Sequence, residues 1–169
     1  MTAAERRAAI LGLLKTQKEP VNATALARQF SVSRQIIVGD IALLRAAGEN
    51  VLATPRGYLL SRKEEGFVRR IACLHREEEM VKELEICVDH GCTVQDVIVE
   101  HPVYGQLVGG LELSSRYDVE QFARRLERES AHSLSELTDG IHLHTLRCPS
   151  EAAYERVCQL LEAQGFLIH

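Results

Sequence analysis

Apolar residues in the first sixty positions recur at helical spacing and are followed by two short extended runs, which predicts three short helices and then a hairpin. The first helix covers about Ala3–Thr16. Asn22 and Ser33, two residue types that favour helix N-caps, precede the second and third helices, and Gly48 follows the third as a stop signal. Val51–Leu60 forms two extended runs around a Pro-Arg-Gly turn. This order predicts a winged helix-turn-helix domain over residues 1–60.

The third predicted helix has one apolar face and one polar face. Ile37, Ile41 and Leu44 recur at i, i+4 and i+7, so they would pack against the preceding helix. The polar face and the wing carry the residues that we expect to contact DNA: Ser33, Arg34, Gln35, Val38, Arg45 and Arg56. In the major groove, Arg pairs with guanine and Gln with adenine. An ordinary helical hairpin with a solvated polar face is the alternative, but turn, cap, core spacing and wing together favour DNA binding.

A different pattern begins after the charged segment Ser61–Gly66, which we interpret as a linker over residues 61–66. Beyond it the periodicity predicts the order β-α-β-β-α-β-α. The predicted strands are Phe67–Leu74, Val94–Glu100, Val103–Leu113 and Ile141–Arg147, and the predicted helices are Arg76–Asp89, Tyr117–Ser130, a short piece around Ser133–Leu137, and Ser150–Gln164. This order predicts the α+β class, with an α/β sandwich over residues 67–169 whose helices pack on one mainly antiparallel sheet.

The charge of the chain is unevenly distributed between its two parts. Residues 1–62 contain nine Lys and Arg against four Asp and Glu, whereas residues 63–169 contain eleven against twenty. All seven histidines lie in the second, acidic part. A basic module suited to phosphates is therefore joined to an acidic module that is rich in candidate metal or proton sites.

The composition is that of a soluble globular protein, with 46% hydrophobic and 26% charged residues. No apolar run reaches the length of a membrane span, and the N-terminal segment lacks the apolar core of a signal peptide, so we expect a cytoplasmic protein without a membrane partner. The odd number of cysteines and the lack of a CxxC pair predict reduced thiols at all five positions. These are Cys73, Cys87, Cys92, Cys148 and Cys158.

The histidines of the second part suggest a metal site. His142 and His144 alternate along one predicted strand, so their side chains project from the same face. His75 follows another predicted strand, and Glu83 lies in the helix after it. If the two strands are neighbours, three imidazoles and one carboxylate converge in a set suited to Ni, Zn, Fe or Mn. His101 is a further candidate for the rim, although histidines at such spacings also occur as surface or core residues.

Three stretches of this sequence resemble one known family, the nicotinate-responsive repressors. They are LARQFSVSRQIIVGDIALLRAAG in the first part and EHPVYGQL and DGIHLHTL in the second, which resembles the 3H domain of these proteins. The resemblance implies a divalent metal held by His75, Glu83, His142 and His144. It also implies nicotinic acid as co-repressor, and we assign His101 and Tyr104 to ligand binding. Gly39 departs from the family pattern, where a longer polar residue is usual, so the operator sequence is not transferable.

These observations together predict a repressor rather than an enzyme. Its expected partners are a double-stranded DNA operator and a second copy of the chain in a homodimer. The resemblance further implies nicotinic acid as a partner and an operator near genes of NAD synthesis or niacin uptake. We expect the dimer surface in the second domain, at its sheet and the apolar helix Ala152–Leu161. A metal-dependent enzyme with an appended DNA-binding domain and a metal-sensing repressor are the alternatives. The lack of a phosphate-cradling glycine loop and of a nucleophile elbow argues against the enzyme.

Overall fold

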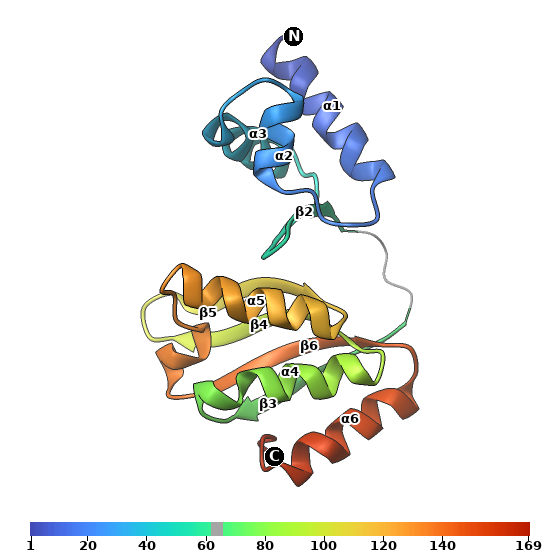
Figure 1. Ribbon diagram of the computed structural model, residues 1–169, viewed down its shortest axis with the longest axis vertical. Helices are drawn as coiled ribbons and strands as arrows, with labels where there is room; N and C mark the ends of the chain where they lie inside the picture. The colour runs from blue at the N-terminus through green and yellow to red at the C-terminus, as the bar shows by residue number, and fades with distance from the viewer. Residues whose placement is uncertain (62–65) are drawn as a thin grey trace. The chain divides into compact units, whose positions relative to one another are not determined.

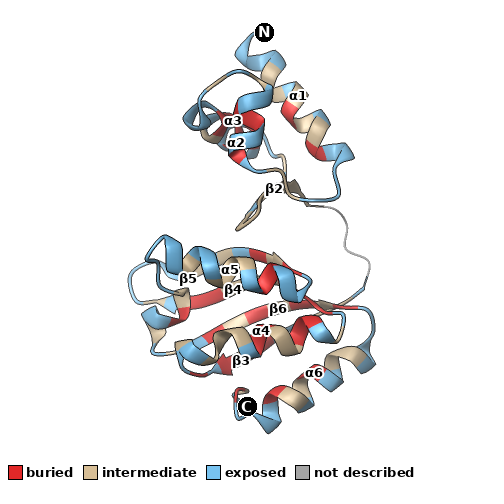
Figure 2. Ribbon diagram, viewed as in Figure 1, coloured by how far each residue is buried: buried red, intermediate tan, exposed pale blue. Residues whose placement is uncertain are grey.

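The structure, a computed structural model, describes residues 1–61 and 66–169. The chain divides into two compact units, Met1–Glu64 and Glu65–His169 (Figure 1). The predicted linker Ser61–Gly66 falls mainly on residues 62–65, which lie outside the described residues. Each unit has its own cluster of buried apolar side chains, and Figure 2 shows buried residues, with the ribbon in red, in both units. Each unit therefore folds around its own core.

The first unit contains three helices and a hairpin, as the sequence predicts. They are α1 (Ala3–Thr16), α2 (Ala23–Gln29), α3 (Arg34–Ala46), β1 (Val51–Thr54) and β2 (Gly57–Leu60). The two predicted N-caps are confirmed, because the Asn22 side chain accepts from the Ala25 N–H at 2.7 Å and that of Ser33 from the Ile36 N–H at 3.3 Å. Gly48, with a φ of +93°, ends α3 as predicted.

The predicted apolar face of α3 is confirmed as the centre of the first core. Ile37, Ile41 and Leu44 are buried together with Ile10, Leu14 and Leu26. A buried carboxylate lies on the same side of α3. Asp40 accepts two hydrogen bonds from the Arg6 guanidinium of α1, at 2.6 Å from Nε and 3.2 Å from Nη2. This paired charge fixes α3 against α1, and sequence reasoning missed it although Asp40 stands between two buried isoleucines.

The wing is fixed to the helices by a close backbone approach. Besides the antiparallel pairing of β1 with β2, Tyr58 exchanges two backbone hydrogen bonds with Val21, of 2.8 and 2.9 Å. Gly57 has a φ of +141°, and a Cβ at that position would lie 2.5 Å from the Val21 carbonyl carbon. Only glycine therefore allows the wing to approach the segment before α2 this closely.

The second unit follows the predicted order of strands and helices. Its elements are β3 (Phe67–Leu74), the short 3-10 turn η1 (Glu77–Glu79), α4 (Met80–Asp89), β4 (Thr93–His101), β5 (Gly105–Leu113), α5 (Arg116–Arg128), the 3-10 turn η2 (Leu134–Thr138), β6 (Ile141–Cys148) and α6 (Glu151–Ala163). The predicted helix Arg76–Asp89 differs slightly, since η1 precedes the α-helix. Among the described residues, no helix combines the length and apolar character that a membrane span requires.

The four strands form one sheet in the order β3-β6-β4-β5, and every pair is antiparallel. Figure 1 shows α4 and α5 side by side on one face of this sheet, and α6 packs against α4, β3 and β6. The α+β prediction is therefore confirmed. Val157 and Leu161 of α6 are fully buried in the core of their own unit. These two apolar side chains are therefore used within the unit, and the dimer surface in the second domain stays a prediction.

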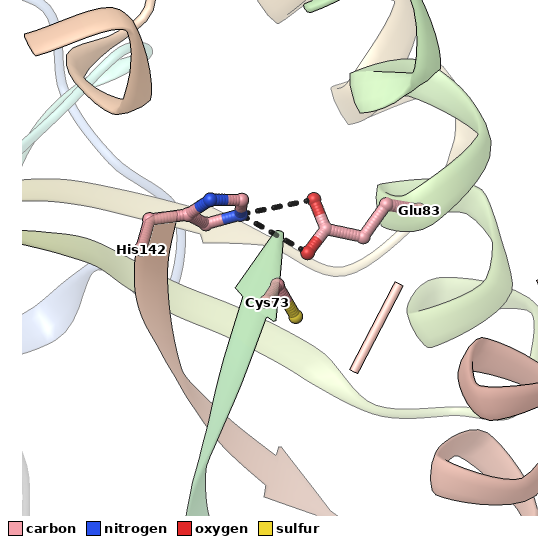
Figure 3. A group of neighbouring side chains, drawn as sticks. All are labelled: Cys73, Glu83 and His142. Carbon is pink, nitrogen blue, oxygen red and sulfur yellow. Dashed lines mark hydrogen bonds and ion pairs between the residues drawn. The ribbon is translucent and has the colours of Figure 1, made fainter. Parts of the chain in front are cut away.

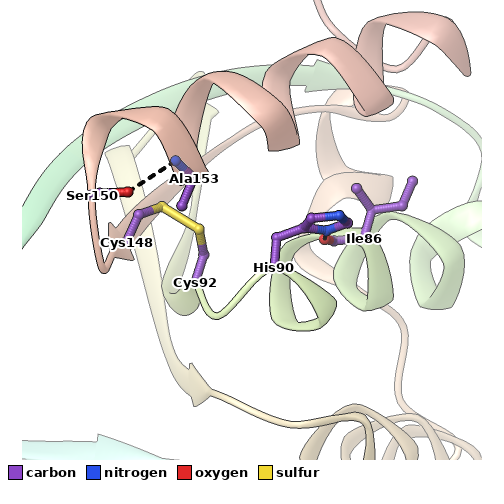
Figure 4. The surroundings of a disulfide bond; sticks show 6 residues. All are labelled: Ile86, His90, Cys92, Cys148, Ser150 and Ala153. Atoms are coloured by element: carbon purple, nitrogen blue, oxygen red, sulfur yellow. Dashed lines mark hydrogen bonds between the residues drawn. A yellow bond between two sulfur atoms is a disulfide. The ribbon is translucent and has the colours of Figure 1, made fainter.

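Two of the five cysteines form a disulfide bond, so the prediction of five reduced thiols is wrong. Cys92 precedes β4 and Cys148 ends β6, and their sulfur atoms are bonded (Figure 4). The register that pairs Thr93 with Arg147 places these cysteines opposite each other, with Cα atoms 4.2 Å apart. Because 56 residues separate them, the pairing depends on strand register and not on spacing along the chain.

Candidate metal centre and candidate DNA interface

The pairing of β3 with β6 assembles the candidate metal centre. His142 and His144 lie on one face of β6, where they are paired with Cys73 and Ile71 of β3. His75 follows the end of β3, and Glu83 lies in the first turn of α4. Figure 3 shows His142 of β6 and Glu83 of α4 pointing toward each other across the end of β3.

The four predicted ligands lie together, with the Glu83 carboxylate among the three imidazoles. The Nε2 atom of His75 is 2.7 Å from Oε2 of Glu83, that of His142 is 3.2 Å from Oε1, and that of His144 is 3.4 Å from both oxygens. The side chains of all four residues are at most 4% exposed. The sequence placed these residues near each other only on the condition that their strands are neighbours, and β3 and β6 are.

Each imidazole is anchored through its other ring nitrogen. The Nδ1 atoms of His75, His142 and His144 lie 2.8, 2.8 and 2.6 Å from the backbone carbonyl oxygens of Arg76, Gly140 and Asp96. Because a carbonyl oxygen only accepts, each Nδ1 carries a proton and donates it. The neutral form of each ring therefore has its lone pair on Nε2, directed at Glu83. Metal-binding histidines in proteins are commonly held in this way.

The buried negative charge of Glu83 is stable only with a positive charge, either a proton or a metal ion, between the carboxylate and the imidazole rings. Burial raises the pKa of Glu83, but the facing imidazoles outweigh burial, so its pKa is lowered well below the ordinary value. Burial lowers the pKa of His75 and of His144, yet the charge and hydrogen bonds of Glu83 outweigh it and raise both. Protons supply the positive charge when no ion is bound. The donor set also fits a divalent transition metal, because neutral imidazole and carboxylate are its usual ligands.

Cys73 is a neighbour of this cluster that sequence reasoning missed. Its Sγ atom, one ring nitrogen of His142 and one carboxylate oxygen of Glu83 all lie within 4.8 Å of one another. Burial and the charge of Glu83 raise the pKa of the Cys73 thiol. The signal in the sequence was the alternation along β3, which puts residues 71 and 73 on the face of the sheet that α4 covers.

A glycine allows the start of β6 to approach His75. Gly140 has a φ of +94°, and a Cβ at this position would lie 2.5 Å from the carbonyl oxygen of His75. The same glycine accepts the Nδ1–H of His142 through its own carbonyl oxygen. The turn between η2 and β6 thus sets the distance between two of the imidazoles.

A cavity of about 610 Å³ lies beside the cluster and shares His75 with it. Its volume is within the range of small-ligand sites, about 300–1,000 Å³. Most of its polar lining is acidic, and Arg76 contributes the one cationic side chain among the lining residues. Its lining residues are Leu74, His75, Arg76, Glu77, Glu78, Glu79, Ser135, Glu136, Asp139 and Gly140. An anionic ligand would therefore need an added positive charge near His75.

The two predicted ligand-binding residues contact each other rather than the histidine cluster. Nδ1 of His101 accepts from the backbone N–H groups of Val103 and Tyr104, at 3.1 and 3.2 Å, and the two rings pack with centroids 5.1 Å apart. Tyr104 is 74% exposed. Among the described residues, neither has a hydrogen bond or ring contact to the four clustered side chains. The structure thus does not bring His101 and Tyr104 into the candidate metal centre.

The predicted DNA-contacting residues begin at the N-terminus of α3. Arg34 and Gln35 are exposed in its first turn, and Val38 is half-buried one turn later. The Ser33 hydroxyl caps the helix by accepting from the Ile36 N–H. Exposed Arg and Gln at this end of a helix are suited to reading base edges in a major groove.

The other two predicted DNA contacts, Arg45 and Arg56, have partners within the first unit. Arg45 donates from Nε to the carbonyl oxygen of Val51 at 2.8 Å, and its guanidinium lies 5.9 Å from the centroid of the Tyr58 ring. Arg56 forms an ion pair with Glu19 at 2.9 Å. Arg45 therefore connects α3 to the wing, whereas the solvent-exposed pair of Arg56 is worth about 0–1 kcal/mol and can yield to a phosphate.

A winged helix-turn-helix unit joined to a separate unit with a buried polar centre indicates a class of protein, the DNA-binding transcription regulators with a second domain. Family models match both units: an HTH domain over residues 6–59 and a 3H domain over residues 68–169. The chain belongs to the NiaR/NadR family of transcription repressors. The predicted family is thereby confirmed.

Two relatives cover nearly the whole chain. A probable transcription repressor NiaR of Thermotoga maritima is 44% identical over 164 residues, which is 97% of this chain and 94% of the relative. The transcription repressor NadR of Bacillus subtilis is 43% identical over 169 residues, covering 98% of this chain and 94% of the relative. Both are named as repressors and not as enzymes, so the protein is a DNA-binding transcription repressor, and the enzyme alternative is set aside.

Proposed function

We propose that this repressor acts in the cytoplasm on genes of NAD synthesis or niacin transport, with nicotinic acid as co-repressor and a divalent transition metal bound in the 3H domain. The observation that carries the proposal is the arrangement around Glu83, where three imidazoles direct Nε2 at one buried carboxylate while their Nδ1 atoms are anchored on backbone carbonyls. His75, Glu83, His142 and His144 would hold the ion. It would supply the positive charge that the acidic cavity beside His75 lacks.

The cavity beside His75 supports a small anionic ligand as the effector. Its volume of about 610 Å³ accommodates a pyridine carboxylate, and Arg76 can pair with the carboxylate group. We further propose a homodimer, since one short recognition helix reads too few bases for a repressor. The ligand would then act through its differential affinity for the arrangement of the two winged units that matches two half-sites.

Replacing His144 with Ala tests the metal and the co-repressor together. We expect the variant to lose stoichiometric metal and to lose its response to nicotinate, because His144 faces Glu83 from the centre of β6. Metal analysis and a nicotinate titration of operator binding measure both effects. His90→Ala is the matched control, because His90 ends α4 with its ring bonded to the Ile86 carbonyl, away from Glu83. A variant that keeps its metal, or that loses it and answers nicotinate with unchanged affinity, contradicts the proposal.

Replacing Arg34 with Ala tests the reading of DNA by α3. If Arg34 is bidentate to guanine, operator binding weakens by about 1–3 kcal/mol and the preference at one base position relaxes. Arg56→Ala is the comparison, for which we expect weaker binding to all sequences and a salt slope smaller by about one, as a phosphate contact requires. Binding measured on operator variants at several salt concentrations separates the two. Equal losses for all sequences with Arg34→Ala would make that residue a phosphate contact as well.

A further inference from the structure

A fifth side chain with a metal-binding atom lies beside the four histidine and glutamate ligands. Cys73 is directly opposite His142 in the β3–β6 pairing, so both side chains project from the same face of the sheet (Figure 3). Sγ of Cys73, a ring nitrogen of His142 and a carboxylate oxygen of Glu83 lie within 4.8 Å of one another, and all three residues are buried. Three donor atoms at such separations can bind one ion, since metal–ligand bonds are about 2.0–2.3 Å long.

The charge of the surroundings favours a sulfur ligand at this position. A divalent ion with three neutral imidazoles and one carboxylate keeps a net positive charge, in a place where the side chains are nearly inaccessible to water. An uncompensated buried charge is strongly unfavourable. A thiolate adds the second negative charge, and the complete set of ion and ligands is then neutral.

We propose that Cys73 is a ligand of the metal, so that the site has nitrogen, oxygen and sulfur donors. This inference rests on the proposed metal site of the 3H domain. When the ion binds, the S–H bond of Cys73 breaks, a sulfur–metal bond forms and one proton leaves to the solvent, with no oxidation or reduction. Thiolate is a soft ligand, so it shifts the preference of the site toward Zn²⁺, Co²⁺ or Ni²⁺ and away from Mn²⁺.

Spectroscopy with Co²⁺ as the probe tests the sulfur bond in the full-length protein. We expect wild type to bind one Co²⁺ per chain with a sulfur-to-cobalt charge-transfer absorption in the near ultraviolet. Cys73→Ser should lack this absorption and bind Co²⁺ at least roughly 10–100-fold more weakly. That is the loss usually caused by mutating a residue that only supports a metal ligand, and removing a ligand itself should cost no less. Cys87→Ser is the matched control, because Cys87 is equally buried four residues after Glu83 but is outside the group of donor atoms. It should keep the absorption.

A measurement on wild type alone keeps the test independent of the folding of the variants. X-ray absorption at the zinc edge should show one sulfur at about 2.3 Å beside nitrogen and oxygen at about 2.0–2.2 Å. A stoichiometric metal surrounded by nitrogen and oxygen only, with no charge-transfer band, overturns the role of Cys73 and leaves the metal site standing. Failure of wild type to bind Co²⁺ or Zn²⁺ overturns the metal site itself, and the role of Cys73 with it.

Discussion

At the scale of single residues, the buried charge of Glu83 is the feature on which the histidine cluster of the second unit depends. It is a buried carboxylate whose charge is offset by three imidazoles at 2.7 to 3.4 Å. A buried charge of this kind is stable only while positive charge remains beside it. Protons and the proposed metal ion would compete for that role, because a protonated Nε2 cannot ligate. The stability of the second unit must therefore depend on pH in opposite ways with and without metal.

Chelated and metal-loaded protein should diverge in thermal stability as the pH rises above 6.5. The pKa values of His75 and His144 are raised from their ordinary 6.5, so without metal their stabilising contribution is complete below 6.5 and is lost as the pH rises through the raised values. Glu83, whose pKa is lowered from 4.5, contributes above 4.5 and loses this contribution as the pH falls through its folded-state value. Metal binding instead strengthens with rising pH.

Thermal unfolding between about pH 5 and 9, with chelator and with added Zn²⁺, measures this divergence. The gap between the two unfolding temperatures should widen with pH. A constant gap over that range would show that the imidazoles do not exchange protons for metal. His144→Ala, which cannot complete the site, should show no gap at any pH.

At the scale of single elements, α3 has a tightly packed inner face and an exposed face that contains a glycine. Its inner face is fixed by Ile37, Ile41 and the Arg6–Asp40 pair, and its N-terminus by the Ser33 cap. Gly39 is exposed in the middle of the helix, and a Cβ built there meets no atom within 4 Å. Packing inside the protein therefore does not require this glycine, and we infer that close approach of DNA to the backbone does.

Gly39→Ala should stabilise the first unit and weaken its binding to DNA. Alanine restricts the unfolded chain and favours the helix, which is worth roughly 0.5–1 kcal/mol at a position with free space. Gly12→Ala is the matched control, because Gly12 is also exposed in a helix, α1, with no atom near its Cβ. Denaturant unfolding should show similar stabilisation of both variants, whereas operator binding should weaken for Gly39→Ala alone. Unchanged operator binding by Gly39→Ala would mean that a base contact is simply missing there.

What the sequence predicted well is local to each element. The helix caps at Asn22 and Ser33 follow from short-range preferences, and the strand β3 has the bounds Phe67–Leu74 that were predicted for it, so neither needed tertiary information. The convergence of the histidines depended on β3 and β6 being neighbours, which the sequence could state only as a condition. The disulfide partners and the nearness of Cys73 to Glu83 depend on strand register and on helix placement. Neither is encoded in the spacing of residues along the chain.

At the scale of the whole molecule, all of the cysteines belong to one of the two units. The first sixty-four residues contain none, and the disulfide Cys92–Cys148 lies within the second unit. A bond that closes a loop of this size restricts the unfolded chain by about 4 kcal/mol in the chain-entropy description. Redox conditions should therefore change the stability of the second unit and leave the winged helix-turn-helix unit unaffected.

A reducing agent should lower the unfolding temperature of the second unit only. Calorimetry with and without reductant should then show a shift of one unfolding transition while the other keeps its temperature. Thiol titration of the unfolded, non-reduced protein should give three free thiols per chain, from Cys73, Cys87 and Cys158. Five thiols, together with an unfolding curve that does not respond to reductant, would contradict the bond.

The burial of the proposed metal ligands should also make exchange of the metal ion slow. An ion enclosed by side chains that are at most 4% exposed can exchange only when a segment of the unit opens, and such openings are rare events in a packed core. The cavity beside His75, in contrast, is accessible to a small molecule on the timescale of diffusion. The ion would then be a resident part of each repressor molecule throughout many cycles of ligand binding. Changes in the cellular concentration of the small molecule, and not of the metal, would then determine how fast repression responds.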